Sequence, residues 1–384
     1  MKKIAILGAS GSVGLQAADV AEKRGYSVDF LSANRDTSAL ETLARKFKPK
    51  AVAMADEASA SDLRARLADT DIKVLFGKEG IIEGIKASEA ETVVNSILGE
   101  AGLEPTLAVI ESGKRLALAN KESLVIAGDI VMKNARERGV EILPVDSEHS
   151  AIFQSLSAGK KSEIRRILLT ASGGPFRGKS REELRQVTLE ETLAHPTWKM
   201  GKKITVDSAT LMNKGFELIE AVHLFETPAE KIEILVHPES ILHSAVEYVD
   251  KTVIGEMSVP NMRMCVQYAV DYPEREECDF APLDLTRLGG LSFFKPDYDA
   301  FPLLSLARRA ASDGGAMGAV MNAADEEAVA AFLSGNLSFL GISDTVIKTY
   351  EKMSRAAACT SLSDILEAAA EARLIAKTYI GVNS

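Results

Sequence analysis

The chain has 384 residues, of which 46% are hydrophobic and 26% are charged, so it can bury a large core and is not a disordered protein. Its formal net charge of −10 argues against a general binding surface for nucleic acid or for an anionic membrane. At roughly 150 residues per domain, this length predicts two or three domains.

Residues 1–145 alternate short apolar runs with segments of helical spacing, a pattern typical of βαβ units and a parallel sheet. The expected strands are Lys3–Leu7, Ser27–Ser32, Ala51–Met54, Ile72–Phe76, Thr92–Asn95, Leu116–Ala119 and Glu141–Val145. The expected helices include Gly14–Lys23, Thr37–Lys46, Ala58–Leu67 and Leu103–Ser112. We therefore predict an α/β fold for this part of the chain.

After residue 146 the pattern changes to that of a second sheet and then of a helical bundle. Its expected strands are Ile164–Thr170, Ile232–Leu235, Ser244–Glu247 and Val253–Ser258. Two capping boxes, Ser180 with Glu183 and Thr188 with Glu191, predict helix starts. Ala194–Lys203 is expected to be a loop and residues 281–302 a linking segment. From Leu303 onward we expect helices broken at Gly314-Gly315, Gly335 and Gly341.

Three scattered cysteines, Cys265, Cys278 and Cys359, show neither metal-ligand spacing nor an even disulfide framework, and they predict a reducing, cytoplasmic environment. The first apolar run stops at Gly8, which is too short for a signal peptide. Runs of about 18 apolar residues do not occur, so the sequence predicts no transmembrane helix.

A glycine-rich loop, Gly8-Ala-Ser-Gly11-Ser-Val-Gly14, follows the first expected strand and opens a helix. Its backbone N–H groups and the helix N-terminus can face a pyrophosphate, which predicts a dinucleotide site; the alternative is a tight turn alone. At the end of the second strand, Arg35 could pair with the 2′-phosphate of NADP, or be a surface charge. Asp36 could instead serve the ribose of NAD.

Two acids, Asp146 and Glu148, follow an apolar run, and residues two apart on an extended chain would face the same side. Farther along, Asn213, Lys214 and Glu217 are spaced so that they share one helix face, which Ser208 could cap. Three carboxylates suit a hard divalent cation, Mg²⁺ or Mn²⁺. The alternative for the helix is an exposed polar face.

The Leu169–Pro175 segment ends in Ser172-Gly-Gly, a turn that could form a backbone nest for an anion, or simply lead from a strand to a loop. In the expected 194–203 loop, His195 and Trp198 could close over a ligand and exclude water. The remaining histidines are expected to be packing or hydrogen-bonding residues, namely His149, His223, His237 and His243.

Taken together, these segments resemble 1-deoxy-D-xylulose 5-phosphate reductoisomerases along nearly the whole chain. The matching strings are GASGSVG at the start, LALANKESLV at 116–125, LPVDSEHSAIFQ at 143–154, TASGGPFR at 170–177, HPTWKMGKKITVDSATLMNKGFELIEA at 195–221 and HPESILHS at 237–244. The sequence departs from the family pattern at four places. The family often has Gly, a basic residue and Asn where Asn34-Arg35-Asp36 stands, and Thr where Ser10 stands. It often has Asn where Thr197 and Asp325 stand.

The resemblance implies a Rossmann-like NADP-binding domain at 1–145, a central α+β catalytic domain at 146–280 and a C-terminal helical domain at 303–384, joined by the 281–302 linker. It implies a homodimer that converts 1-deoxyxylulose 5-phosphate to 2-C-methylerythritol 4-phosphate with NADPH and a divalent metal. Whether a carbon–carbon bond breaks fully or migrates stays open.

The resemblance also assigns roles to residues. The implied metal ligands are Asp146, Glu148 and Glu217, with Lys121 and His195 as further catalytic residues. The implied substrate contacts are Lys121, Ser147, Glu148, Ser172, His195, Trp198, Ser208, Asn213, Lys214 and Glu217. The implied cofactor contacts are Gly8, Ser10, Gly11, Ser12, Val13, Asn34, Arg35, Asp36, Asn120, Glu122 and Gly201.

Two other classes of function compete with this reading. One is another NADP-dependent oxidoreductase acting on a small phosphorylated carbonyl compound, and many such enzymes need no divalent metal. The other is a dinucleotide-sensing regulator, which would need no carboxylate cluster and would be expected to carry a basic DNA-binding element.

Overall fold

A computed structural model describes residues 2–198 and 200–383, and over these residues the chain folds into two compact units. Unit 1 comprises Met1–Ser123, Val131–Ser150 and Asn261–Phe280. Unit 2 comprises Leu124–Ile130, Ala151–Pro260 and Ala281–Ser384. The expected division of the chain after residues 145, 280 and 302 stays a prediction.

Unit 1 is built around a parallel sheet, which in the described residues has seven strands in the order β4-β3-β2-β1-β5-β6-β7. The strands are β1 (Lys3–Leu7), β2 (Ser27–Ala33), β3 (Ala51–Met54), β4 (Lys73–Phe76), β5 (Thr92–Asn95), β6 (Arg115–Leu118) and β7 (Ile142–Pro144). Each begins and ends within one residue of its expected position. The strand order reverses at β1, so the carboxyl ends of β1 and β5 mark the switch point where such sheets bind ligands.

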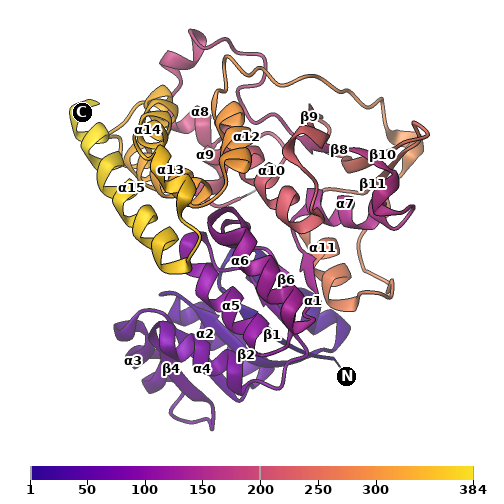
Figure 1. The fold of residues 1–384 in the computed structure, drawn as a ribbon. Helices are drawn as coiled ribbons and strands as arrows, with labels where there is room; N and C mark the ends of the chain where they lie inside the picture. Colours follow the sequence, from indigo (N-terminus) through magenta and orange to yellow (C-terminus); the bar gives the residue numbers. More distant parts are fainter. Residues whose placement is uncertain (1, 199, 384) are drawn as a thin grey trace. The chain divides into compact units, whose positions relative to one another are not determined.

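The helices of unit 1 connect these strands and cover the sheet (Figure 1). They are α1 (Ser12–Arg24), α2 (Thr37–Phe47), α3 (Glu57–Arg66), α4 (Gly77–Ala87), η1 (Gly99–Gly102), α5 (Leu103–Glu111) and α11 (Met262–Asp271). Helices α6 (Glu122–Arg138) and α7 (Ser147–Leu156) contribute residues to both units. The expected helices are confirmed, whereas α4, α6, α7 and α11 had not been assigned.

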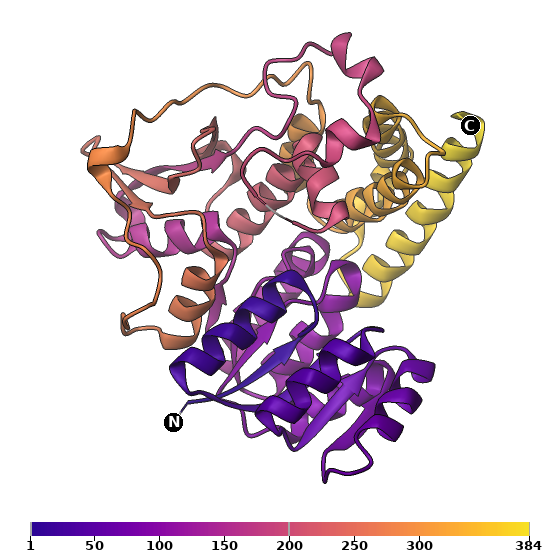
Figure 2. The same cartoon turned by 180° about the vertical axis from the view of Figure 1, so that it is seen from behind.

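The turn between β1 and α1 needs a glycine because strand and helix approach closely there. A Cβ atom on Gly14 would lie 2.2 Å from the backbone oxygen of Gly8 and 2.7 Å from the Cα atom of Ala9. Figure 2, seen from behind, shows the indigo first strand and the helix that follows it. The glycine at position 14 therefore lets the helix pack directly on the loop.

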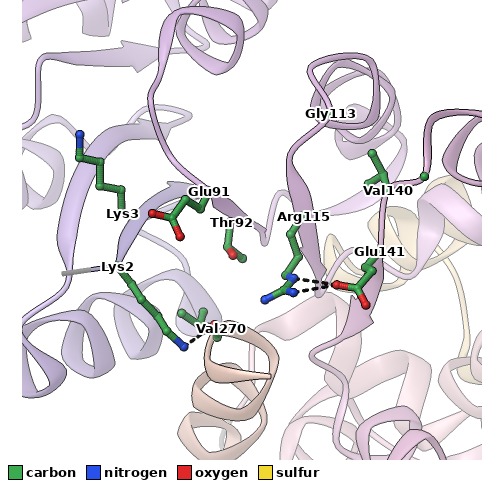
Figure 3. Close-up of a pocket in the computed structure, with 10 residues that line it drawn as sticks. Lys2, Lys3, Glu91, Thr92, Gly113, Arg115, Val140, Glu141 and Val270 are labelled. Atoms are coloured by element: carbon green, nitrogen blue, oxygen red, sulfur yellow. Dashed lines mark hydrogen bonds and ion pairs between the residues drawn. The ribbon is translucent and has the colours of Figure 1, made fainter. Parts of the chain in front are cut away.

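A cavity of about 320 Å³ opens at the amino ends of the strands of the unit 1 sheet, at the edge opposite the switch point (Figure 3). The Arg115 guanidinium in its wall donates to Glu141 at 2.7 Å, and the Lys2 ammonium pairs with Asp271 at 2.8 Å. Ligands of open parallel sheets bind at the carboxyl ends of the strands, so this cavity is not the expected dinucleotide site.

Unit 2 contains the expected second sheet, which in the described residues has the strand order β11-β10-β8-β9. Its strands are β8 (Ile164–Ala171), β9 (Ile232–Val236), β10 (Leu242–Tyr248) and β11 (Val253–Met257). Strand β8 runs parallel to β9 and antiparallel to β10, and β10 runs antiparallel to β11. Residues 281–302 contain only one short turn of helix, η5 (Leu285–Arg287), and Phe294 bridges to Val236.

The helices of unit 2 lie in the middle and at the end of its sequence, and those from Leu303 onward are gathered in the orange and yellow part of Figure 1. They are η2 (Lys161–Glu163), η3 (Glu183–Gln186), α8 (Leu189–Leu193), α9 (Lys202–Ala209), α10 (Met212–Phe225), η4 (Ala229–Lys231), α12 (Leu303–Asp313), α13 (Met317–Leu333), α14 (Phe339–Lys352), η6 (Ser354–Ala358) and α15 (Leu362–Asn383).

Two local predictions for unit 2 were wrong or incomplete. Gly341 does not break a helix, because Ser338 caps α14 by accepting from the Gly341 N–H at 3.1 Å. The Thr188 capping box starts α8 as expected, but the reciprocal bonds of Ser180 with Glu183 precede a 3-10 turn instead of an α-helix.

Within the described residues, no helix has both the length and the apolar character needed to cross a membrane.

The close approach at Gly14 generates a stability prediction. Gly14→Ala is expected to lower the free energy of unfolding by about 1–3 kcal/mol, because the added methyl group would overlap the Gly8 backbone oxygen. Urea unfolding measures this, with Gly289→Ala as the control because nothing lies within 4 Å of a Cβ atom there. Equal stability of the two variants would contradict the packing argument.

Candidate functional site

The glycine-rich loop leads from the carboxyl end of β1 into α1. Gly11 occupies the N-cap of α1, and no side chain caps the helix. Gly11 and Ser12 are exposed, and Ser10 and Val13 are half-buried. A helix start with accessible backbone N–H groups at a sheet switch point suits a pyrophosphate.

Two charged residues after β2, Arg35 and Asp36, bear on whether the site binds NADP or NAD. The Asp36 carboxylate caps α2 by accepting from the Ala39 N–H at 3.0 Å. Arg35 is 77% exposed in its side chain, and its Nε lies 3.4 Å from Asp56 Oδ2. Arg35 is therefore accessible to a ligand, and its acidic neighbour Asp36 serves its own helix. Asn34 is exposed beside them.

Asp56 was not singled out in the sequence, although an acid directly after β3 and before a helical pattern is a helix-start signal. It caps α3 through the Ser59 N–H at 2.9 Å. Bonds from the Ser59 backbone and hydroxyl, followed by the charge of Arg35, hold the pKa of Asp56 below its ordinary value. Asp56 therefore stays ionised beside Arg35.

Asn120 and Glu122 follow β6 and are buried, at 2% and 8% exposure. The Asn120 amide donates to the backbone oxygens of Ile97 and Gly99 at 2.7 and 2.9 Å and to Glu122 at 3.0 Å. Asn120 thus ties the loop after β5 to the start of α6, at the carboxyl end of the sheet.

The first carboxylate group of the site lies in unit 1, around the start of α7. Lys121 is buried and its ammonium donates to Asp146 Oδ2 at 2.8 Å. The His149 ring, fully buried, lies with Nδ1 3.1 Å from Asp146 Oδ1, and the Ser147 hydroxyl donates to Glu148. We call Lys121, Asp146, Ser147 and Glu148 the first half-site.

The expectation that Asp146 and Glu148 share one face of an extended chain was wrong. Helix α7 begins at Ser147, and the Glu148 N–H donates to Asp146 Oδ1 at 3.2 Å. Asp146 therefore precedes the first turn of a helix, and Glu148 lies within that turn. An acid before a helix start and another in its first turn both interact favourably with the helix dipole.

The second carboxylate group lies in unit 2, at the start of α10. The Asn213 amide and the Lys214 ammonium both donate to Glu217, one to each carboxylate oxygen. Lys214 is 4% and Glu217 is 1% exposed, so the alternative of an exposed polar helix face was wrong. Ser208 does not cap this helix, because it lies in the last turn of α9 and Leu211 precedes α10 in a left-handed conformation.

The Ser172-Gly-Gly turn packs against the end of α9. A Cβ atom on Gly174 would lie 2.6 Å from the Ser208 backbone oxygen and 3.2 Å from the Ala209 Cα atom. The Ser172 hydroxyl lies 3.1 Å from Nε2 of His195. Together, Ser172, His195, Ser208, Asn213, Lys214 and Glu217 form what we call the second half-site.

The hydrogen bonds of His195 assign its tautomer. Its Nδ1 accepts from the backbone N–H groups of Thr197 and Trp198 at 3.1 and 2.9 Å. The proton of the neutral ring is then on Nε2, which donates toward the Ser172 hydroxyl. Burial lowers the pKa of His195, so the ring stays neutral at pH 7 and presents one donor.

The expected 194–203 loop is shorter than predicted, because α9 begins at Lys202. Within it, the Trp198 ring is tilted against the ring of His243, with centroids 6.3 Å apart. Gly201 is exposed at the N-cap of α9, and Lys199 lies outside the described residues. The histidines expected to pack or hydrogen-bond do so: His237 and His243 are buried, and His237 Nδ1 lies 2.9 Å from the Ser292 backbone oxygen.

The two half-sites present different chemical groups. The first half-site presents two acids and one ammonium, and the second presents one acid with hydroxyl, amide, imidazole and ammonium donors. Carboxylate oxygens are ligands that hard divalent cations prefer. The ammonium–carboxylate pairs Lys121–Asp146 and Lys214–Glu217 indicate that these acids are ionised and favour a positive partner.

Comparisons with known proteins agree over most of the chain. A family model for 1-deoxy-D-xylulose 5-phosphate reductoisomerase matches residues 4–128, a model for its C-terminal domain matches 142–225, and a DXP reductoisomerase C-terminal domain matches 257–375. The reductoisomerase of Acetivibrio thermocellus is 50% identical over 348 residues, covering 91% of each chain. That of Caldanaerobacter subterraneus subsp. tengcongensis is 51% identical over 354 residues, covering 91% of this chain and 92% of the relative.

Solved structures extend the agreement to three dimensions. The reductoisomerase from Zymomonas mobilis in complex with NADPH matches with a TM-score of 0.91 and 42% identity, covering 99% of each chain. A DOX-P reductoisomerase in complex with NADPH, fosmidomycin and magnesium matches with a TM-score of 0.93 and 38% identity, covering 100% of this chain and 99% of that one. The family resemblance of the sequence motifs and the predicted fold class are thereby confirmed.

The lowered pKa of His195 generates a prediction for its protonation. We expect the imidazole to remain the neutral tautomer protonated on Nε2 at pH 7, and to take up a proton only below its ordinary pKa of 6.5. A folded-state pKa below the unfolded value means that its contribution to the free energy of unfolding is lost as pH falls below 6.5. Nitrogen-15 NMR of labelled histidine measures both, and a charged ring at pH 7 would contradict the assignment.

Proposed function

This chain belongs to the 1-deoxy-D-xylulose 5-phosphate reductoisomerase family, and from that premise we propose which of its residues carry out the reaction. The enzyme rearranges 1-deoxy-D-xylulose 5-phosphate and reduces the product to 2-C-methyl-D-erythritol 4-phosphate, in non-mevalonate isoprenoid precursor synthesis. Its cofactors are NADPH and a divalent metal ion. The alternative, another NADP-dependent oxidoreductase, is not favoured, because relatives named as reductoisomerases match 91% and 96% of the chain.

We assign the metal to Asp146 and Glu148 of the first half-site together with Glu217 of the second. Each of the three has a carboxylate oxygen to offer as a ligand. Oxygen ligands of this kind fit Mg²⁺ or Mn²⁺ and would not select a soft metal. The buried pairing of Glu217 with Lys214 and Asn213 is the observation that carries this assignment, since it makes Glu217 a fixed, ionised ligand.

The substrate phosphate is assigned to the donors of the second half-site. Ser172 and Ser208 lie on segments that pack together, since Gly174 closely approaches the Ser208 backbone. Asn213 and Lys214 add an amide and an ammonium, and neutral His195 adds its Nε2–H. Phosphate binding anchors a part of the substrate that does not react, and its binding energy can orient the reacting end. Ser147, Lys121 and Trp198 are the further proposed substrate contacts.

NADPH is assigned to the carboxyl edge of the unit 1 sheet. Gly8, Ser10, Gly11, Ser12 and Val13 would hold the pyrophosphate at the start of α1. Arg35, exposed and held by Asp56, would meet the 2′-phosphate, with Asn34 and Asp36 beside it. Asn120, Glu122 and Gly201 are the remaining proposed contacts.

The lysines of the half-sites can also bind substrate oxygens. If the three acids hold a divalent ion, it would supply Lewis-acid stabilisation of oxyanions formed in the rearrangement. NADPH supplies the hydride. Lys121 and Lys214 each carry an ammonium group that could donate to a substrate oxygen. Trp198 and His195, on the loop before α9, can exclude water from the reacting end.

The proposal also covers the oligomeric state, the cellular location and the domain boundaries. We propose a homodimer joined through the central domain, supported by exposed apolar side chains on the edge strand β11, where Val253 is 50% and Ile254 is 37% exposed. We propose a cytoplasmic location, supported by the free thiols of Cys278 and Cys359. We propose that the cofactor, catalytic and C-terminal domains divide near residues 145, 280 and 302.

The first test measures NADPH oxidation with 1-deoxyxylulose 5-phosphate in the presence of Mn²⁺ or Mg²⁺, and then with excess EDTA. We expect turnover that EDTA abolishes and that added metal restores. Turnover that persists in EDTA would contradict the metal assignment, and NADPH binding without turnover would return the oxidoreductase and sensor alternatives.

A second prediction concerns Glu217. Glu217→Gln is expected to lower kcat by on the order of a hundredfold or more, because one anionic metal ligand is lost, while the Kd for NADPH is unchanged. Glu226→Gln, an exposed acid at the end of the same helix, is the control and should leave both values as they are. Full activity of Glu217→Gln would remove this residue from the metal site.

A third prediction concerns the proposed dimer. Ile254→Lys is expected to yield monomers, because a charge on the edge strand β11 opposes burial of its apolar face. Light scattering after size-exclusion chromatography gives the mass. Lys251→Glu, on the turn before β11, exchanges an already charged residue and serves as the control. An unchanged mass for Ile254→Lys would place the interface elsewhere.

A further inference from the structure

A cluster of two buried carboxylates and one partly exposed lysine in unit 2 is not used by the proposed reaction. Lys203 of α9 donates to Oδ2 of Asp207, one turn farther along the helix, at 2.7 Å. It also donates to Oδ2 of Asp325, on α13, at 2.8 Å. Asp207 is 3% and Asp325 is 0% exposed, so one ammonium ties together two helices that are distant in sequence. The i,i+4 spacing of Lys203 and Asp207 was the only trace of it in the sequence.

The charges of this cluster do not balance if both acids are ionised. One ammonium faces two carboxylates, and an unbalanced buried charge is costly. Oδ1 of Asp207 and Oδ1 of Asp325 are both buried and, among the described residues, have no hydrogen-bond donor. A proton shared between the two carboxyl groups would satisfy both oxygens and leave the cluster neutral.

The titration of Asp207 agrees with this geometry. Burial raises the pKa of Asp207 well above its ordinary value of 3.8, and the charge and hydrogen bond of Asp325 raise it further, while Lys203 opposes both. Other charged groups nearby are engaged elsewhere. Glu326 of α13 pairs with Arg373, and Glu191 of α8 belongs to the Thr188 capping box. On α10, Lys214 pairs with Glu217, and the centroid of the Phe216 ring lies 5.0 Å from the Lys203 ammonium.

The cluster adjoins the proposed phosphate site. Asp207 immediately precedes Ser208, and the backbone of Ser208 and Ala209 is the surface on which Gly174 packs. A shift of the last turn of α9 would therefore move both the Ser208 hydroxyl and the Ser172 loop. We propose that Lys203, Asp207 and Asp325 form a proton-sharing tie between α9 and α13 that positions the substrate's phosphate site. These three are positioning residues, and the inference rests on the proposed function.

The test separates the tie from the proposed function by using isosteric and disruptive variants. Asp207→Asn keeps a donor toward Asp325 and should retain the KM for 1-deoxyxylulose 5-phosphate at pH 7 within about twofold. Asp207→Leu should raise that KM roughly tenfold to a hundredfold, because the anchoring groups move. The Kd for NADPH, which is assigned to unit 1, should be unchanged in both variants.

The pH dependence gives a readout that a merely structural role would not share. In the unsubstituted enzyme the shared proton is lost as pH rises through the pKa of folded Asp207, so the KM should rise on the alkaline side. The free energy of unfolding should likewise fall as pH rises from the unfolded value of 3.8 through the folded one. Asp207→Asn carries no titrating proton at this position, so both slopes should flatten.

Controls make each outcome decisive. Asp344→Asn removes a carboxylate from an exposed ion pair with Arg181 and should change neither KM nor the pH slopes. If Asp207→Leu does not fold, Asp325→Ala tests the tie from α13. Reduced stability of these variants without any change in KM, or an unfolding slope that Asp207→Asn leaves intact, would overturn the inference. If the unsubstituted enzyme fails to turn over the substrate, the proposed function fails, and the unfolding slopes still test the tie.

Discussion

Buried lysines set the geometry of both half-sites, because each carboxylate that leaves water needs a positive partner. Lys121 holds Asp146 in unit 1, and Lys214 holds Glu217 in unit 2. Such pairs add little net stability, since desolvation offsets much of the attraction, but breaking one leaves an uncompensated charge. Their effect is therefore to fix where each acid can lie, and a metal-dependent site requires its ligands to be fixed in this way.

The periodicity of hydrophobic residues and the turn residues were enough to predict most of the secondary structure. The seven strands of the first sheet lie within one residue of their expected positions, because buried parallel strands read as short apolar runs bounded by polar turns. Gly341 was misread because glycine breaks helices on average, whereas here the Ser338 hydroxyl accepts from its N–H in the first turn. Helix α11 was missed because its partner, α1, lies more than 230 residues earlier in the chain.

The sequence nominates residues for the candidate site but does not specify their geometry. Spacing put Asn213, Lys214 and Glu217 on one helix face, yet it could not say whether that face is buried, since burial depends on tertiary packing. For Asp146 and Glu148, the extended spacing gave a wrong local structure, because the strand ends at Pro144 and a helix begins at Ser147. The tautomer of His195 depends on two backbone N–H groups that no motif specifies.

The acid beside Arg35 shows why such ambiguities arise. An aspartate after the second strand can accept from a ribose or cap the next helix, and the residue type fits both roles. Asp36 accepts from the Ala39 N–H, while a second acid, Asp56, caps α3 and faces Arg35. Each acid therefore has a structural reason to be present that does not require a ribose partner. The guanidinium between the strand ends remains exposed, and that is what recognition of a 2′-phosphate needs.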